Sequence, residues 1–178
     1  VVLATVTWTG GGGTLVWGHG SNWDSGALPG NGDDVVIPDL GQVSVTYNNV
    51  FGGNTFNSLV VDVPFIIASF VDPLNITSTA TFNSSLTQGN SPIGGDGDIT
   101  INGLYTWNTS THGGGGTTVI NGGLLIPGNT SQHTLSRTLE IAGVGNLGGA
   151  PLSVSSSGTL RTSATGSINV VAASTISG

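Results

Sequence analysis

A short motif of one apolar residue, one small or polar residue and glycine recurs at a nearly constant spacing in the second half of the chain. Its copies are Ile101-Asn102-Gly103, Ile120-Asn121-Gly122, Ile141-Ala142-Gly143 and Ile176-Ser177-Gly178. Phe82 precedes the first copy, and Leu160 follows the third, at offsets similar to those between the copies, and a shorter step leads to Ile176. A period of about 20 residues with glycine at the corners is typical of stacked coils, each made of three short strands and tight turns. The sequence therefore predicts a β-solenoid, or parallel β-helix, in which residues 58–178 are repeats of about 20 residues.

The rest of the pattern also favours strands over helices. The chain has a single glutamate, no lysine and no methionine, and 31 of its 178 residues are glycine, so strong helix formers are scarce. Apolar residues alternate with polar ones, as in half-buried strands, in residues 43–47, 74–76 and 99–101. Two longer apolar runs, 59–63 and 65–71, predict strands covered on both faces. The chain is predicted to be all-β.

The spacing near the C-terminal end fits a second architecture. Leu152, Leu160 and Ile168 are equally spaced, with an offset of eight, which is typical of strands in an antiparallel meander. An antiparallel β-sandwich or jelly roll is therefore the alternative fold. In either case the length of 178 residues predicts one domain, residues 1–178.

The first fifty residues differ from the repeats. They hold three of the four tryptophans, Trp8, Trp17 and Trp23, between glycine-rich stretches. The end of a solenoid exposes an apolar cross-section and unpaired strand edges, so large aromatic side chains are expected to cover it. Residues 1–50 are therefore predicted to form a tryptophan-rich N-terminal cap.

The segment from Trp8 to Ile37 reads W-T-G-G-G-G-T-L-V-W-G-H-G-S-N-W-D-S-G-A-L-P-G-N-G-D-D-V-V-I. It resembles the opening segment of secreted, autotransporter-like parallel β-helix surface proteins, in which a tryptophan, an N-W pair, a G-x-x-P turn and a D-x-V-x-I strand follow in this order. The resemblance implies a secreted or surface-exposed β-solenoid used for adhesion or structure, and it implies no catalytic residues.

The tryptophans have a second interpretation, in which their ring faces are open to solvent. An exposed indole of Trp8, Trp17 or Trp23 would stack on a sugar ring, and nearby polar side chains such as Asn22 and Asp24 would bond its hydroxyls. Because indoles of globular domains are usually largely buried, the cap is the preferred interpretation.

The charge of the chain excludes several classes of partner. It has two cationic side chains and a net charge of −7, so it lacks the cations that neutralise nucleic-acid phosphates or anionic lipids. The longest apolar run, 63–71, contains Pro64 and Ser69 and is much shorter than the roughly 18 residues of a membrane span. Neither nucleic-acid binding nor membrane insertion is expected.

Several features point to the outside of the cell. The composition, which lacks lysine and is rich in serine, threonine, asparagine and glycine, fits an extracellular setting. Separately, the absence of cysteine excludes disulfides and cysteine-based zinc sites. The sequence begins with Val1 rather than methionine, which a removed signal peptide explains. Trypsin-like proteases would find only Arg137 and Arg161. We therefore expect an extracellular or cell-surface location.

One segment is close to a calcium-binding repeat. Residues 94–99, G-G-D-G-D-I, approximate the repeat G-G-x-G-x-D, but the acid falls one residue early, at Asp98, and the motif occurs once. Calcium coils need successive copies to supply six or more oxygens. Asp96 and Asp98 are therefore expected to form turns, as is the pair Asp33-Asp34, with calcium binding as the alternative. No metal and no other cofactor is predicted.

Catalytic groups are not evident. His19, His112 and His133 are far apart and lie in no recognisable nucleophile or zinc motif. Asp96 and Asp98 would face the same side of a strand, but no cation or second acid pair lies nearby in the sequence to tune them. The protein is not expected to be an enzyme.

Four N-x-S/T sequons begin at Asn75, Asn83, Asn108 and Asn129. Asn108 and Asn129 lie beside loop segments, where a glycan is more easily accommodated, so they are the favoured pair. The alternative is that all four asparagines are unmodified.

Low charge leaves strand edges without the usual protection against pairing. The leading functional prediction is an extracellular structural or adhesive protein that associates with itself, in a filament if head-to-tail contacts do not close. The apolar start of the chain, with Val1, Val2, Leu3 and Val6, is the candidate strand for pairing with a neighbouring copy. Its alternative role is an ordinary first strand of its own domain. The alternative function is a carbohydrate-binding module or adhesin that acts as a monomer on glycans.

Overall fold

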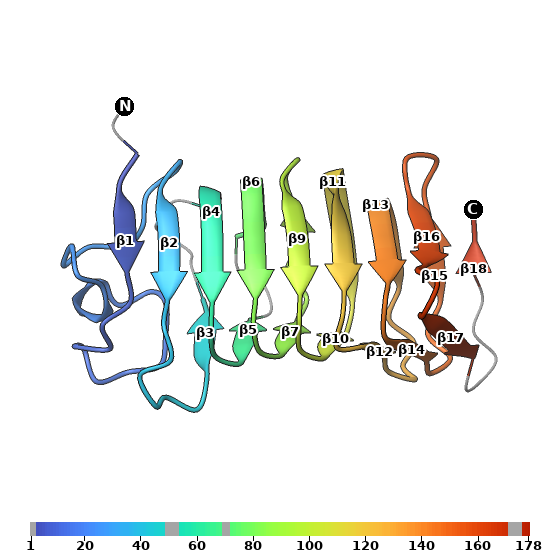
Figure 1. Ribbon diagram of the computed structural model, residues 1–178, viewed down its shortest axis with the longest axis horizontal. Helices are drawn as coiled ribbons and strands as arrows, with labels where there is room; N and C mark the ends of the chain where they lie inside the picture. Colours follow the sequence, from blue (N-terminus) through green and yellow to red (C-terminus); the bar gives the residue numbers. More distant parts are fainter. Residues whose placement is uncertain (1–2, 49–53, 69–71, 171–175) are drawn as a thin grey trace.

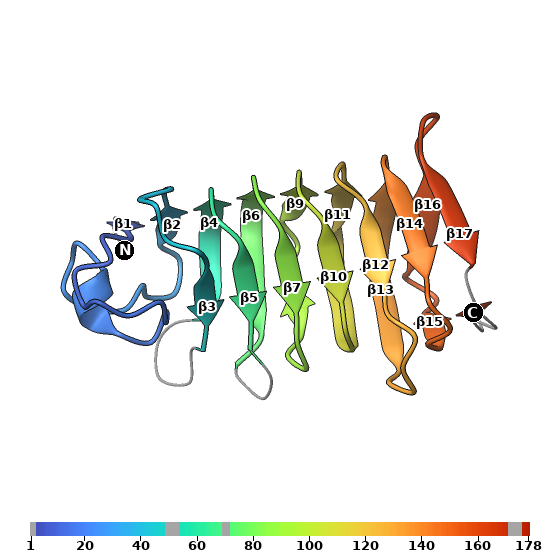
Figure 2. The same ribbon diagram turned by 90° about the horizontal axis from the view of Figure 1, so that it is seen from below.

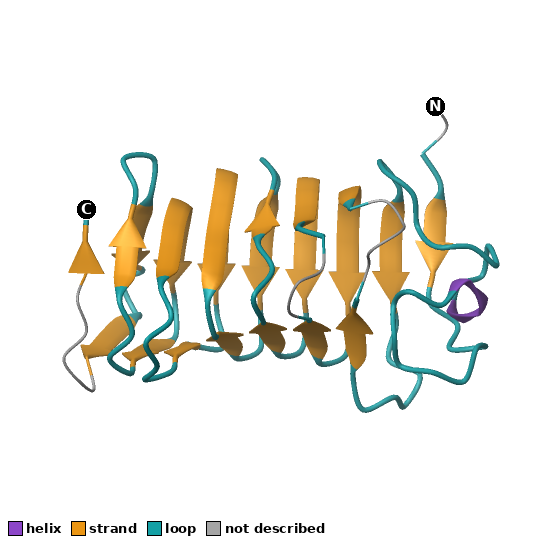
Figure 3. Cartoon of the chain, turned by 180° about the vertical axis from the view of Figure 1, so that it is seen from behind, coloured by secondary structure: helices purple, strands orange, loops and turns teal. Residues whose placement is uncertain are grey.

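The chain forms a β-solenoid, a stack of parallel coils with almost no helix (Figure 1). The computed structural model describes residues 3–48, 54–68, 72–170 and 176–178. A single turn of 3₁₀-helix, η1 (Gly20–Asn22), is the one helix among these residues, as Figure 3 shows. No helix in the described ranges has the length and apolar character needed to cross a membrane.

Two sheets run along the stack. The larger has eleven strands: β1 (Thr5–Thr7), β2 (Asp34–Ile37), β4 (Thr55–Val61), β6 (Leu74–Phe82), β8 (Ile93–Gly94), β9 (Asp98–Ile101), β11 (Ser110–Ile120), β13 (His133–Ile141), β15 (Leu152–Val154), β16 (Thr159–Thr162) and β18 (Ile176–Ser177). The smaller has seven: β3 (Val45–Tyr47), β5 (Phe65–Ile67), β7 (Leu86–Gln88), β10 (Tyr105–Trp107), β12 (Leu124–Ile126), β14 (Val144–Leu147) and β17 (Ser167–Val170). Figure 2 shows the smaller sheet in front of the larger one.

Every ladder between described strands is parallel, which confirms the solenoid and excludes the antiparallel sandwich. β15, β16 and β17, which contain the equally spaced apolar residues, each pair with a strand of the preceding coil rather than with one another. The equal spacing of Leu152, Leu160 and Ile168 therefore reflects three sides of one coil.

The register confirms a repeat of about 20 residues. One inward position per coil runs through Leu59, Ala80, Ile99, Thr118, Leu139 and Leu160, each of which lies opposite the next in a parallel ladder. The end of the predicted series was wrong in detail. Leu160 stacks on Leu139 rather than on Ile141, and Ile176 stacks on Leu152 on another side of the coil.

The interior is filled by inward side chains that stack from coil to coil. One such row is Val61, Phe82, Ile101, Ile120 and Ile141, all at most 1% exposed. The outer face of each coil is solvated because only one layer of strands surrounds this core. The prediction that 59–63 and 65–71 are covered on both faces is therefore wrong for the part described: Val60 of β4 is 36% exposed and Ile66 of β5 is 37% exposed.

Glycine is required where consecutive coils meet at a corner of the larger sheet. Gly95 and Gly114 have φ angles of +87° and +102°. A Cβ at Gly95 would lie 2.1 Å from the carbonyl oxygen of Ile76, and one at Gly114 would lie 1.8 Å from that of Gly95. Any side chain at either position would separate the coils.

A row of side-chain amides ties four coils together on the outside. Asn121 donates through Nδ2 to Oδ1 of Asn102 (2.8 Å), Asn102 donates to Asn83 (2.9 Å), and Asn83 donates to the carboxylate of Asp62 (2.7 Å). Each residue lies in the turn that leaves the larger sheet. This asparagine ladder fixes the register, because a shift of one residue would break every bond in it.

The first strand pairs within its own chain. β1 lies parallel to β2, with Val6 opposite Val35, and Val6 is only 4% exposed. Val6 is thus part of the domain's core and not available for a neighbouring copy, whereas Leu3 is 50% exposed. Val1 and Val2 lie outside the described residues. The alternative prediction, an ordinary first strand, is the one that the pairing supports.

Candidate functional site: the N-terminal cap and the polar interior

The three N-terminal tryptophans pack against one another over the first coils. The Trp8 and Trp17 rings lie edge-on to Trp23, with centroids 5.2 and 4.6 Å away. Trp23 also donates through Nε1 to the carbonyl oxygen of Trp17 at 3.0 Å. The aromatic cluster continues to Tyr47 and Phe56. This packing is consistent with the predicted cap. Because β1, β2 and β3 of residues 1–50 belong to the two sheets, the cap in the structure is the segment between β1 and β2, residues 8–33.

The same burial corrects the sugar-platform interpretation. Trp8, Trp17 and Trp23 are 2%, 0% and 2% exposed. Their ring faces are occupied by protein side chains, so none of them can stack on a sugar ring in this conformation. Any ligand at this end of the molecule must be held in another way.

The side chain of Asn22 holds the cap together, and that of Asp24 joins the cap to the first coil. Asn22 donates to the Thr14 hydroxyl (2.9 Å) and the Val16 carbonyl (3.0 Å) and accepts from the Gly12 amide (2.9 Å). Asp24 accepts from the Thr7 amide at 3.0 Å, and its own amide donates to the Thr7 carbonyl at 2.9 Å. Alternate residues of a strand bond to the strands on its two sides, and the backbone N–H and C=O of Thr7 point away from β2. The two bonds between Asp24 and Thr7 therefore occupy part of the outer edge of β1.

The outer edge of the smaller sheet is covered in the same region. Thr46 of β3 donates to the Leu15 carbonyl and accepts from the Trp17 amide, both at 2.8 Å. Residues 15–24 of the same chain therefore occupy the outer edge of β3 and part of the outer edge of β1.

A pocket opens beside the cap. Its volume is about 350 Å³. The residues that line it carry no charged side chain; they are Trp8, Thr9, Gly10, Gly13, Thr14, Leu15, Leu40, Gly41 and Gln42. The pocket brings the start of the cap next to the loop that leads into β3.

A chain of buried polar side chains crosses the middle coils. Gln88 donates to the Ser91 and Thr111 carbonyls at 2.9 and 3.0 Å. The Tyr105 hydroxyl bonds to Oε1 of Gln88 and lies 3.2 Å from Nδ1 of His112. Nε2 of His112 lies 2.8 Å from the Thr118 hydroxyl. Gln88, Tyr105, His112 and Thr118 are all fully buried.

Burial, with a smaller contribution from the Arg137 charge, lowers the pKa of His112 to about 3. The ring is therefore neutral at physiological pH. Because the single Tyr105 proton goes to Gln88, Nδ1 of His112 must donate to the Tyr105 oxygen and Nε2 must accept from Thr118. Burial likewise raises the pKa of Tyr105. These groups are held neutral and satisfied, which suits a structural role rather than acid–base chemistry.

Arg137 is buried at the corner where the glycine-rich turns meet, with 1% of its surface exposed. It donates to the carbonyl oxygens of Gly97 (2.6 Å), Gly113 (3.1 Å) and Gly116 (3.1 Å), which belong to the two preceding coils. Burial lowers the pKa of the guanidinium, and the nearby Asp98 and Asp96 carboxylates oppose this effect. Arg137 thus joins three consecutive coils.

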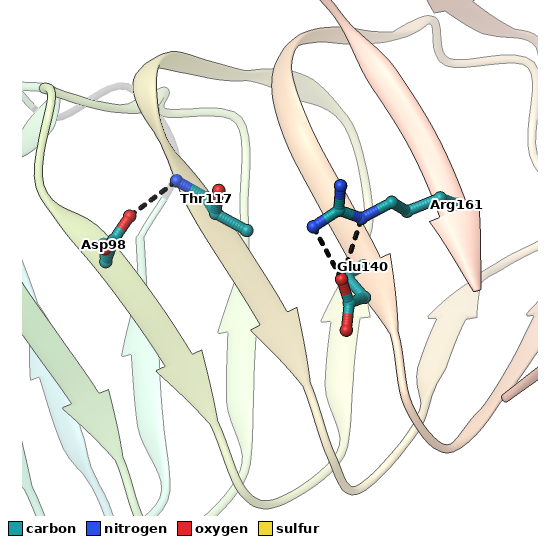
Figure 4. Close-up of polar contacts among 4 residues, drawn as sticks. All are labelled: Asp98, Thr117, Glu140 and Arg161. Carbon is teal, nitrogen blue, oxygen red and sulfur yellow. Dashed lines mark hydrogen bonds and ion pairs between the residues drawn. The ribbon is translucent and has the colours of Figure 1, made fainter. Parts of the chain in front are cut away.

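Asp96 and Asp98 lie exposed on the outside of the same corner, where each accepts a hydrogen bond from the next coil. Asp96 bonds the Gly115 amide at 2.9 Å, and Asp98 bonds the Thr117 amide at 2.8 Å (Figure 4). Two coils along, Arg161 forms an ion pair with Glu140 at 2.7 Å, again between neighbouring coils. The aspartates therefore bond the backbone between coils.

Asp33 and Asp34 are also occupied by protein groups. Asp33 accepts from the Gly30 and Ala4 amides at 2.8 and 3.3 Å. Asp34 accepts from Ser58 and Asn57, and these bonds lower the pKa of Asp34. Within the described ranges, no three His, Asp or Glu side chains gather as they would around a metal ion.

The four sequon asparagines differ in what their amides do. Asn83 belongs to the asparagine ladder, and Asn129 donates through Nδ2 to the Asn108 carbonyl at 3.0 Å. Asn75 lies half-buried in β6, beside Gly94 of the next coil. The side-chain amides of Asn108 and Asn75 have no protein partner among the described residues, and both residues are half-buried. Asn108 lies in the short link between β10 and β11, whereas Asn75 lies within β6. Asn108 is therefore the sequon that requires the least rearrangement to carry a glycan.

The histidines do not come together around a reactive group. His19 is exposed on the cap. His112 and His133 are buried, and both rings pack against the ring of Trp107, with His133 Nε2 bonded to the Trp107 carbonyl at 2.9 Å. Comparisons of the chain with protein-family models, with curated proteins and with solved structures give no match. The resemblance of residues 8–37 to secreted β-helix proteins stays a prediction.

Proposed function

We propose that the protein is an extracellular structural or adhesive component and that molecules made of these 178 residues associate through the coil of β16, β17 and β18. The observation that carries this proposal is the difference between the two ends of the described stack. Residues 15–24 cover the outer edge of β3 and part of that of β1, whereas the outer edges of β16, β17 and β18 pair with no strand of the described residues. Unpaired parallel strands are a template for strands of another molecule.

Apolar side chains accompany these open edges. Val170 of β17 is 59% exposed and Ile176 of β18 is 50% exposed, while Leu160 and Ile168 are only partly buried against the core. Pairing of two C-terminal coils would bury this apolar surface and provide hydrogen-bond partners for the unpaired backbone N–H and C=O groups of the edge strands. Such a joint uses the same surface on both copies, so it closes as a pair, and the covered N-terminal end disfavours the head-to-tail filament expected from the sequence.

The rest of the molecule suits a structural role. Its outward positions are mostly threonine, serine and asparagine, and the buried Gln88, Tyr105 and His112 are neutral and hydrogen-bonded to one another. Trypsin-like proteases find one accessible cleavage site, at Arg161, because Arg137 is buried. These features support an extracellular or cell-surface location and no enzymatic activity.

Sedimentation velocity over a range of concentrations tests this proposal. We expect the wild type to form dimers and Val170→Lys and Ile176→Lys to remain monomeric, because a lysine on the joint places like charges opposite one another. Leu104→Lys is the matched control, since Leu104 is 44% exposed in the middle of the stack. A monomeric wild type, or equal effects of all three substitutions, would contradict the proposal.

The alternative function, a carbohydrate-binding module that acts as a monomer, is favoured by one observation, the uncharged pocket beside the cap.

A further inference from the structure

The pocket beside the cap has the size of a small-ligand site. Ligand pockets are usually about 300–1,000 Å³, and this one, at about 350 Å³, lies at the lower limit. Two segments that are distant in sequence form it, residues 8–15 of the cap and residues 40–42 before β3. Its capacity matches one or two sugar rings rather than a nucleotide or a peptide.

A hydrogen-bond donor without a protein partner lies at this pocket. Trp8 is 2% exposed and lines the pocket. Its Nε1 would be 3.6 Å from a Cβ at Gly10, which is another lining residue. No described residue accepts a hydrogen bond from this N–H, in contrast to the Trp23 N–H, which bonds the Trp17 carbonyl. The Trp8 N–H is thus available to a ligand oxygen.

The walls combine apolar surface with uncharged polar groups. Leu15 is 39% exposed and Leu40 is 58% exposed, so both offer C–H surface to a ligand. The absence of charged lining leaves an anion or a cation without compensation for its lost hydration. A neutral sugar has both the hydroxyl acceptors and the C–H faces that this lining matches.

The loop that forms one wall is fixed before any ligand arrives. Gln42 accepts from the Leu40 amide and donates to the Pro38 carbonyl, both at 2.8 Å. Asp39 accepts from the Gly41 amide at 2.9 Å, which directs its carboxylate to the backbone. A wall that is already ordered lowers the entropic cost of binding.

We infer that this pocket binds a neutral mono- or disaccharide, with the Trp8 indole N–H as donor and Leu15 and Leu40 as apolar walls. This site differs from the stacking platform predicted from the sequence, since it uses the edge of one indole and no ring face. It also goes beyond self-association, because it lies at the opposite end of the stack from β17 and β18 (Figure 1).

Ligand-observed saturation-transfer NMR on the full chain tests the inference with two pairs of probes. Glucose is compared with glucuronate, and N-acetylglucosamine with glucosamine, so that each pair differs in charge. We expect a neutral sugar to bind with a Kd of about 1–10 mM and its charged counterpart to bind at least fivefold more weakly.

Two variants locate the site. Leu40→Ala removes an exposed wall without touching the core, and we expect it to weaken binding at least threefold, whereas Val43→Ala, 76% exposed and outside the pocket, leaves binding unchanged. Trp8→Phe removes the N–H and is expected to weaken binding about three- to tenfold. Its circular dichroism and melting curve show whether the cap remains folded.

The inference is overturned if no probe binds at 50 mM, if charged and neutral sugars bind equally, or if Leu40→Ala and Val43→Ala behave alike. Sedimentation of Leu40→Ala separates the two proposals. The variant keeps the self-association of the wild type if the C-terminal coil carries it, whatever the outcome of the sugar titration.

Discussion

Replacing Arg137 by methionine tests how the middle coils are held together. The guanidinium donates to three carbonyl oxygens in two other coils; the bonds to Gly97 and Gly113 are buried and the bond to Gly116 is partly buried. A buried acceptor left without its donor costs about 1–3 kcal/mol, so two such acceptors and the partly buried one cost about 3–7 kcal/mol. Removing a buried charge recovers a few kcal/mol of desolvation. The net loss expected for Arg137→Met is about 3–5 kcal/mol.

For a chain of 178 residues, 1 kcal/mol corresponds to about 2–4 °C in Tm. Arg137→Met should therefore melt roughly 10–15 °C below the wild type in a scan followed by circular dichroism. Arg161→Met is the matched control. It removes the other arginine, whose side chain is 54% exposed and which forms one surface ion pair, and it should shift Tm by about 1–2 °C.

Hydrogen exchange locates the effect. The amides of residues 113–116 should exchange faster in Arg137→Met, and Arg137→Lys should give an intermediate loss, because one ammonium cannot reach all three carbonyls in the geometry of a planar guanidinium. Equal melting shifts for Arg137→Met and Arg161→Met would refute the argument that the buried guanidinium joins the coils.

The interior, the outer ladder and the sequons give three more predictions. The pKa of His112 is about 3 in the folded state and about 6.5 in the unfolded chain. Because only the unfolded chain binds this proton between the two values, the free energy of unfolding should fall by up to about 1.4 kcal/mol per pH unit as pH drops from 6.5 toward 3. Denaturant titrations should show a shallower pH dependence of stability for His112→Gln than for the wild type, and an unchanged slope would contradict this. Asn102→Asp removes the donor to Asn83 and should cost about 1 kcal/mol in urea unfolding, whereas a neutral effect would mean that the asparagine ladder contributes nothing. If the protein is produced in a cell that glycosylates sequons, peptide mapping should find glycan at Asn108 first, and glycan only at Asn83 or Asn75 would be the opposite result.

The fold class could be predicted because its signal is repeated. The inward row Phe82, Ile101, Ile120 and Ile141 recurs once per coil, and glycine marks the corners, so an error at one coil does not change the conclusion. The predicted step from Ile141 to Leu160 is 19 residues, as from Ile101 to Ile120, but the register there repeats every 21 residues, so Thr162 lies opposite Ile141. Nothing in the local sequence distinguishes Leu160 as a partner of Leu139 from one of Ile141. Alternation over residues 43–47 predicts that Val43 shares the inward face with Val45 and Tyr47, but β3 begins at Val45 and Val43 is 76% exposed.

The polar interior was missed although part of its signal was present. In β13 the residues at alternating positions, Leu135, Arg137, Leu139 and Ile141, all point inward. Alternation therefore predicts that Arg137 points inward, although a charged side chain is not expected in an apolar interior. The compensating carbonyls come from the two preceding coils, which only the register reveals. The pocket was equally hidden, because residues 8–15 and 40–42 are brought together by the cap.

The central claim, that copies meet through their C-terminal coils, can be measured directly because the chain contains no cysteine. Spin labels on Ala164→Cys, in the turn between β16 and β17, and on Ala27→Cys, in the cap, occupy exposed sites at opposite ends. With seven strands in the smaller sheet at about 4.8 Å per coil, pulsed electron paramagnetic resonance should give a distance of about 20–30 Å between copies for the Ala164→Cys label and roughly 70 Å for the Ala27→Cys label. A short distance between labels on Ala27→Cys, a short distance between one label of each kind in a mixed sample, or no distance between copies at all would contradict it.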